Sequence, residues 1–348
     1  MIERFDLGGG YRISRVIKGG WQLAEGHGES APADPVGDMR AFVRRGIDTF
    51  DCADIYTGVE ALVGEFLRRN RESAEPVPVR VHTKYVPDLD ALATLRRADV
   101  EAIIDRSRRR LGQERLDMVQ FHWWDTTVPG WLAAAGWLRD LQQAGKIDRL
   151  SLTNFNASDT RRMLEAGVPL TTTQVQYSLL DSRPAKALAS LCANNGMHLL
   201  CYGTLAGGFL SDRWLGAADP LASGAPMENR SLTKYRLIIE EAGGWDRFQA
   251  LLETLATIGK RHGVGIASVA SRWVLERPRV AAVIIGARNA AHLDRYAELF
   301  RFRLAGQDRR EIDAVRAELA VPSGDVFDLE RDRGGRHGRI MKYNLNAD

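Results

Sequence analysis

Eight short runs of apolar and β-branched residues recur along the 348-residue chain, and most are followed by a longer amphipathic stretch. Strands that alternate with helices favour a parallel sheet, because a helix is the usual connection between parallel strands. Eight such units favour an α/β fold of the (β/α)8 TIM-barrel type over an open doubly wound sheet, which stays possible. The strand candidates are residues 15–18, 47–51, 79–83, 117–122, 149–152, 172–175, 198–202 and 280–285.

Helical periodicity occupies most of the connections between these strands. The apolar residues from Phe248 to Ile258 form one stripe, and Gly263 provides a C-terminal stop for that helix. No GxGxxG follows a strand, which weighs against an open dinucleotide-binding sheet. The predicted helices are residues 35–45, 60–70, 94–111, 130–144, 158–165, 183–195 and 245–262.

Three segments lie outside this rhythm. Residues 1–14 contain a run of three glycines and are expected to form an N-terminal β-hairpin that caps the barrel floor. Residues 211–244, after the seventh strand, are rich in Gly, Pro, Asn and Ser and are expected to be a long inserted loop. Residues 321–348 are expected to form a C-terminal tail over the outside or the mouth. We therefore expect residues 1–348 to form a single barrel domain.

The composition excludes several classes of protein. Hydrophobic residues make up 45% and charged residues 27%, which excludes a disordered chain, and a net charge of +3 gives little reason to expect nucleic acid or an anionic membrane as partner. The widely spaced Cys52, Cys192 and Cys201 favour reduced thiols, and no run has the length of a transmembrane helix, so a cytoplasmic protein is expected. No HExxH, HxH or paired-cysteine spacing indicates a metal site.

Four polar residues stand at or just after the ends of separate strand candidates. Asp51, Lys84 and His122 end the second, third and fourth strands, and Tyr56 follows Asp51 within one loop. Alone, each could be a helix cap, a surface charge, a core histidine or a packing residue. Together they are more specific, because catalytic groups of a barrel gather at the carboxyl ends of its strands.

These four side chains form a consistent unit for proton transfer. A phenol with a pKa near 10 is a poor acid at neutral pH unless a cation stabilises its phenolate, and Lys84 could do that for Tyr56. Asp51 would hold the lysine in place and keep it charged. A neutral imidazole of His122 could orient a carbonyl substrate by a hydrogen bond.

Longer motifs around these residues resemble the aldo-keto reductase superfamily, in the branch that includes bacterial aldo/keto reductases and potassium-channel β subunits. They run in the family's order over almost the whole chain. The motifs are GGWQ from residue 19, FDCADIY from 50, HTKY from 82, MVQFHWWD from 118, GKIDRLSLTNF from 145, QVQYSLLD from 174, CYGTLAGGFL from 201 and VIIGARNAAHL from 283.

The resemblance implies a nicotinamide-dependent oxidoreductase with Tyr56 as acid and base, Lys84 and Asp51 tuning its pKa, and His122 orienting the substrate. It also implies a set of cofactor-binding residues along the strand ends. NADP(H) is favoured over NAD(H), because Arg288 stands just before a helical pattern. The guanidinium group of an arginine and the amino terminus of a helix can both bind a phosphate. The implied cofactor-binding residues are Gly20, Trp21, Asp51, Thr153, Asn154, Gln174, Tyr202, Gly203, Thr204, Leu205, Gly207, Gly286, Arg288, His292 and Tyr296.

Aromatic residues flank the catalytic positions and are expected to contact a small carbonyl or alcohol substrate: Trp21, Tyr85 and Trp123, with Trp214 as a lid residue on the long loop. Two other functions stay open. One is a regulatory subunit that binds NADP(H) and turns over slowly. The other is an unrelated barrel enzyme in which Lys84 forms a Schiff base. The sequence leaves the oligomeric state open.

Overall fold

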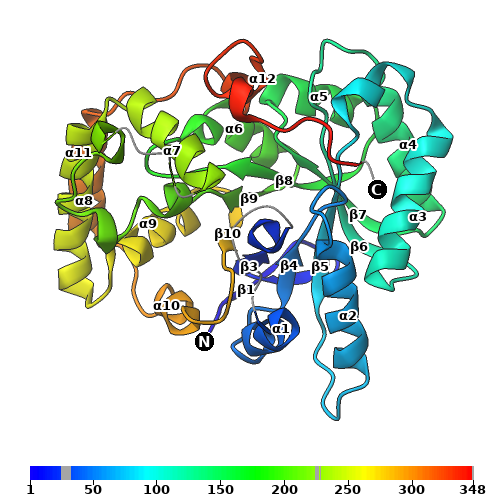
Figure 1. Cartoon of the computed structure of the whole chain (residues 1–348), viewed down its shortest axis with the longest axis horizontal. Helices are drawn as coiled ribbons and strands as arrows, with labels where there is room; N and C mark the ends of the chain where they lie inside the picture. Colours follow the sequence, from blue (N-terminus) through cyan, green and yellow to red (C-terminus); the bar gives the residue numbers. More distant parts are fainter. Residues whose placement is uncertain (25–32, 224–226, 228, 347–348) are drawn as a thin grey trace.

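A closed barrel of eight parallel strands forms the centre of the computed structural model, which describes residues 1–24, 33–223, 227 and 229–346 (Figure 1). Strands adjacent in sequence are adjacent in space, and the last pairs with the first. This confirms the predicted barrel and its eight strands. The strands are β3 Val16–Gly19, β4 Thr49–Asp51, β5 Arg80–Tyr85, β6 Leu116–Phe121, β7 Ile147–Thr153, β8 Leu170–Gln176, β9 His198–Tyr202 and β10 Val280–Gly286.

The predicted helices surround the barrel. Their ends follow from local chemistry: the Asn156 side chain accepts a hydrogen bond from the Asp159 amide at the start of one helix, and Gly263 ends another in the left-handed conformation. These helices are α1 Pro35–Arg44, α2 Val59–Arg71, α3 Arg97–Leu111, α4 Trp131–Gln143, α5 Ala157–Glu165, α6 Ala187–Asn194 and α8 Trp245–His262.

The helical pattern expected after Arg288 corresponds to α10 Leu293–Glu298, and four further helices were not predicted from the sequence: α7 Arg230–Glu241, α9 Ile266–Leu275, α11 Gly306–Ala317 and α12 Asp328–Arg331. None of the helices in the described part of the chain combines the length and the apolar character needed to cross a membrane.

The amino-terminal hairpin closes one end of the barrel, as predicted. Strands β1 Arg4–Asp6 and β2 Arg12–Ser14 pair antiparallel, and the glycines between them take positive φ angles that other residues adopt only with strain. Tyr11 and Ile13 of the hairpin pack with Met118 and Leu200, which face the interior of the barrel. The hairpin does not cover the other end of the barrel, where the carboxyl ends of the strands meet and a site can form.

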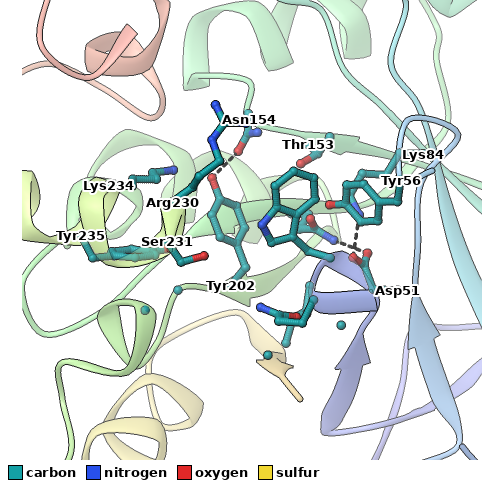
Figure 2. A pocket seen from close by; sticks show the side chains of 18 of the residues that line it. Asp51, Tyr56, Lys84, Thr153, Asn154, Tyr202, Arg230, Ser231, Lys234 and Tyr235 are labelled. Carbon is teal, nitrogen blue, oxygen red and sulfur yellow. Dashed lines mark hydrogen bonds and ion pairs between the residues drawn. The ribbon is translucent and has the colours of Figure 1, made fainter. Parts of the chain in front are cut away.

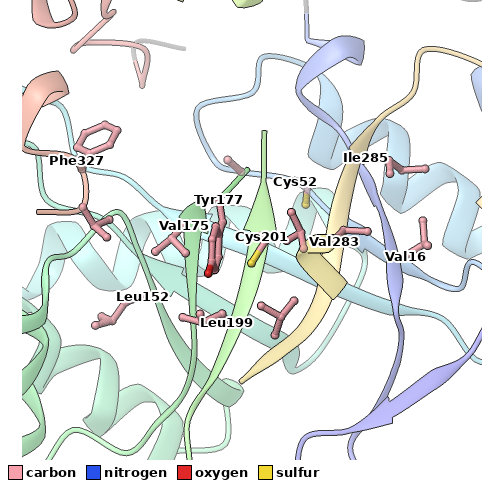
Figure 3. Close-up of a cluster of buried hydrophobic side chains, with 14 of the residues drawn as sticks. Val16, Cys52, Leu152, Val175, Tyr177, Leu199, Cys201, Val283, Ile285 and Phe327 are labelled. Carbon is pink, nitrogen blue, oxygen red and sulfur yellow. The ribbon is translucent and has the colours of Figure 1, made fainter. Parts of the chain in front are cut away.

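Side chains alternate between the two faces of each barrel strand. On β9, Leu199 and Cys201 belong to the main core outside the barrel, whereas Leu200 between them faces the interior cluster. Figure 3 shows the main-core side, with Val175, Leu199, Cys201 and Val283 on neighbouring strands. This two-residue period decides which strand-end side chains reach the barrel mouth.

The predicted loop at 211–244 is wrong in part. It contains short 3-10 turns at Asp212–Trp214 and Pro220–Ser223, and then the helix α7. Residues 224–226 and 228 of this segment, and 347–348 of the tail, lie outside the described residues. The tail crosses the barrel mouth, drawn in red in Figure 1, and the backbone amides of Leu345 and Asn346 donate to Asp88.

Candidate active site

A cavity of about 460 Å³ opens at the carboxyl ends of the barrel strands, and Figure 2 shows its wall. Most of the residues predicted from the sequence lie in this wall. They are Trp21, Asp51, Tyr56, Lys84, His122, Thr153, Asn154, Gln174, Tyr202, Gly203, Thr204, Leu205, Gly207, Gly286 and Arg288.

A buried ion pair lies at the bottom of the cavity. The Lys84 Nζ donates to Asp51 Oδ2 at 2.6 Å and to the Cys52 carbonyl oxygen at 2.9 Å. The other carboxylate oxygen, Oδ1, accepts from Gln174 Nε2 at 2.6 Å and Gln120 Nε2 at 2.8 Å. Burial alone would lower the pKa of Lys84, but the Asp51 carboxylate outweighs that effect and raises it above its ordinary value, so the lysine stays charged.

Tyr56 lies beside this ion pair. The Lys84 Nζ is 4.8 Å from the centre of the phenol ring, and the centre of the Trp21 ring is 5.1 Å from it. Burial raises the pKa of Tyr56, while the positive charge of Lys84 acts in the opposite direction. A cation that stabilises the phenolate is the arrangement that a tyrosine needs in order to transfer a proton.

His122 is neutral and its ring has a fixed orientation. Burial, and then the positive charge of Arg331, lower its pKa to about 3. Its Nδ1 lies 3.1 Å from the Thr153 carbonyl oxygen, and a carbonyl can only accept, so Nδ1 carries the proton. The buried Nε2 has no partner in the described part of the chain and is left as a hydrogen-bond acceptor. It therefore suits a hydroxyl group better than the carbonyl oxygen expected from the sequence.

Polar side chains at the ends of β7, β8 and β9 form the next part of the wall. Asn154 adopts a positive φ of 64°, which asparagine tolerates better than most residues, and its Oδ1 accepts from the Tyr202 hydroxyl at 2.8 Å. With Thr153 and Gln174 beside them, these groups present amide and hydroxyl functions to the cavity. They can hold the carboxamide of a nicotinamide against the Tyr202 ring.

The glycine-rich turn after β9 packs against α7, which sequence reasoning missed as a helix. A Cβ on Gly203 would lie 2.0 Å from the Tyr235 hydroxyl oxygen, and one on Gly207 would lie 3.1 Å from the Ser231 carbonyl oxygen. These glycines therefore allow the helix to approach. As a result Asn229, Arg230, Ser231, Lys234 and Tyr235 enter the cavity wall.

The carboxyl-terminal tail also contributes to the wall, through Phe327, Ile340, Met341, Lys342 and Leu345. The tail is anchored by buried charge: Arg183 donates to Asp181 at 2.7 Å, and Glu330 lies 3.5 Å from Arg183 and 3.4 Å from Lys234. The ionisable residues within a weakly periodic tail were the one sequence signal for this anchor. The sequence did not indicate which residues they pair with.

Three residues predicted to contact the substrate lie outside the cavity wall. Tyr85 and Trp123 are fully buried in the main core, where Tyr85 stacks on Phe121 and the Trp123 Nε1 donates to the Val128 carbonyl oxygen. Trp214 packs on Phe209 and is not among the residues of the cavity wall. Trp21 lies in the wall as expected. Trp124, rather than the predicted Trp123, also lies in the wall.

The residues predicted for the adenosine end lie apart from the cavity wall. His292 is exposed on the surface, and Tyr296 packs on Phe42 in the core. The helix expected directly after Arg288 begins only at Leu293, so its amino terminus does not lie next to this arginine.

Gly20 has a packing role rather than a place in the wall. A Cβ at this position would lie 2.8 Å from the Asp51 carbonyl oxygen, so glycine lets the turn after β3 approach the strand that carries Asp51.

Comparisons with known proteins agree with this architecture. The model of the Aldo/keto reductase family matches residues 15–317. The aldo-keto reductase YhdN of Bacillus subtilis is 26% identical over 331 residues, covering 91% of this chain and 95% of that protein. Flagellar radial spoke protein 5 of Chlamydomonas reinhardtii is 30% identical over an alignment of 259 residues, which covers 64% of this chain but only 49% of that protein.

A solved structure supports the fold alone. The glycerol dehydrogenase of Gluconobacter oxydans superimposes with a TM-score of 0.73 at 24% identity, covering 93% of this chain and 96% of the other. Because the family model matches most of the chain and the tyrosine, lysine and aspartate of its motifs meet in one cavity, the chain belongs to the aldo/keto reductase family.

Proposed function

We propose that the protein is an NAD(P)(H)-dependent oxidoreductase that interconverts a carbonyl compound and its alcohol, with NADP(H) favoured over NAD(H). The observation that carries the proposal is the buried contact of Lys84 with Asp51, beside Tyr56, at the bottom of the cavity. Hydride transfer to a carbonyl carbon needs a proton for the oxygen, and this unit provides one.

The cavity wall fits an anionic dinucleotide. It holds five basic side chains and one acidic side chain, and the acidic Asp51 is already paired with Lys84. Arg288 is exposed and forms no ion pair with the described residues, so it is free for a phosphate. Tyr202 and Gln174 would hold the nicotinamide ring, which supplies the hydride when bound. The further basic residues of the wall are Arg230, Lys234 and Lys342.

In the direction of reduction, the Tyr56 hydroxyl donates its proton to the oxygen of the substrate as the carbonyl carbon is reduced. Lys84 stabilises the phenolate that remains, and Asp51 keeps the lysine charged and in place. Proton transfer of this kind contributes about a hundredfold to ten-thousandfold to the rate. His122 accepts a hydrogen bond from the hydroxyl of the alcohol through Nε2.

The variant Y56F tests the proposal. It keeps the ring and loses the proton, so we expect NADPH binding, followed by the fluorescence of the bound nucleotide, to be retained and NADPH oxidation with a reactive aldehyde to fall by at least a hundredfold. The matched control is Y11F, at the opposite end of the barrel, because the Tyr11 hydroxyl is buried and has no partner in the described residues. Turnover by Y56F close to that of wild type would refute the assignment.

A regulatory or structural subunit that binds NADP(H) and turns over slowly is the second candidate. The 30% identity to a protein named for the flagellar radial spoke favours it. Steady-state turnover across a panel of carbonyl compounds separates the two, since a subunit would bind NADPH but oxidise it only slowly with every compound.

A further inference from the structure

The part of the cavity beside Tyr56 and His122 has an apolar and aromatic wall. Trp21 packs on Tyr56, and the rings of Trp124 and Phe327 stand edge-on to His122 at 4.4 Å and 5.4 Å. The tail closes the same wall with Ile340, Met341 and Leu345. A polyol would lose hydrogen bonds to water against such a wall without regaining them, whereas an apolar body would gain from burial.

One donor in this wall is unused. Trp124 is 8% exposed and its ring is held between His122 and Tyr343, at 4.4 Å and 5.2 Å. Its Nε1 is buried and has no hydrogen-bond partner in the part of the chain that the structure describes. The Nε1 of the neighbouring Trp123, in contrast, donates a hydrogen bond to the Val128 carbonyl oxygen.

An indole N–H can only donate, and a buried donor without a partner is costly. A group that satisfies Trp124 has to be an acceptor, and the cavity that Trp124 lines is the place from which a ligand can bring one. Trp124 lies beside His122, which the proposed function places at the reacting oxygen, so the acceptor belongs to the substrate rather than to the cofactor.

We propose that the substrate is an aromatic or otherwise apolar aldehyde or ketone with a second oxygen that accepts a hydrogen bond from Trp124 Nε1, and that sugars are poor substrates. This inference rests on the proposed function. Trp124 would then be a specificity-determining residue, and the apolar residues of the tail would form the rest of the substrate wall.

The test compares kcat/KM with NADPH for three kinds of aldehyde: 3- and 4-methoxybenzaldehyde, the ethylbenzaldehydes of the same shape, and D-glyceraldehyde. For wild type we expect the aromatic aldehydes to exceed glyceraldehyde by at least about tenfold. We expect W124F, which removes the N–H and keeps an aromatic ring, to lower kcat/KM for the better methoxy isomer about three- to tenfold. The value for its ethyl counterpart should change less than twofold.

The control variant is W137F on α4, whose side chain lies outside the cavity wall, and it should leave both values unchanged. Glyceraldehyde used as well as the aromatic aldehydes would overturn the substrate class and leave the proposed function intact. Equal losses for the methoxy and ethyl compounds in W124F would overturn the role of the indole N–H. Failure of folded wild type to oxidise NADPH with any aldehyde would overturn the proposed function itself.

Discussion

Replacing Asp51 with Asn tests the buried charge pair on which the site depends. Both side chains of the pair are about 5% exposed, and the two carboxylate oxygens accept three hydrogen bonds from Lys84, Gln120 and Gln174. An amide can keep an oxygen toward the glutamines only by turning its NH2 toward the ammonium. D51N therefore leaves a buried charge without a partner, a change that typically costs about 3–5 kcal/mol.

The pH dependence sharpens this expectation. In wild type the pKa of Lys84 is raised, so the stability that the pair contributes is present below the ordinary lysine pKa and is constant between pH 7 and 9. In D51N, burial lowers the pKa of Lys84, and the lysine can escape the penalty by losing its proton. Losing that proton costs about 1.4 kcal/mol for each pH unit below an ordinary lysine pKa of about 10.4. The free energy of unfolding that D51N loses is therefore limited to about 5 kcal/mol at pH 7 and about 2 kcal/mol at pH 9.

The assay is urea denaturation of wild type and D51N at pH 7 and pH 9. We expect a loss of about 3–5 kcal/mol at pH 7 that shrinks to about 2 kcal/mol or less at pH 9. The control E65Q removes a surface carboxylate that pairs with Arg68 and Arg69 and should change little at either pH. A loss in D51N that is below about 1 kcal/mol, or that is the same at both pH values, would refute the reasoning.

Two further predictions concern packing and acid sensitivity. G203A would bring a Cβ to 2.0 Å from the Tyr235 hydroxyl oxygen at a φ of +68°, so we expect a lower Tm, and a smaller loss of Tm when the same change is made in Y235F, which lacks that oxygen; an equal loss would contradict the contact. Burial lowers the pKa of His82 to about 3, so only the unfolded chain binds a proton there between pH 6.5 and 3, and stability falls as the pH decreases through that window. In urea denaturation at pH 7 and pH 5, H82Q should lose less stability on acidification than wild type; an equal loss would contradict this prediction.

The sequence predicted the barrel because its determinants are local. Each strand is a short apolar run and each helix has its own periodicity, as in α8 with its stripe from Phe248 to Ile258. Parallel pairing then brings the carboxyl ends of all strands to one rim. Asp51, Lys84 and His122 could therefore be placed together from sequence, since each needed only the end of its own strand to be found.

The helix α7 and the tail could not be placed in the same way. Leu232, Tyr235, Ile238 and Ile239 have helical spacing after the capping Asn229, so the helix had a signal that the Gly, Pro and Ser around it obscured. Its position in the cavity wall depends on close packing against a glycine turn. The tail depends on a buried ion cluster around Glu330, whose partners lie more than 90 residues away along the chain. Contacts of this kind leave no local pattern.

The wrong choice between Trp123 and Trp124 has a different cause, because the information was in the sequence. On the paired strands β5 and β6, Lys84 lies opposite Gln120 and Tyr85 opposite Phe121, so the residues alternate between the barrel interior and the main core. The same alternation continues past the end of β6. His122 reaches the cavity, Trp123 returns to the core, and Trp124 reaches the cavity again. On an extended strand, the position next to a cavity residue thus predicts the opposite face, and a distance of two residues predicts the same face.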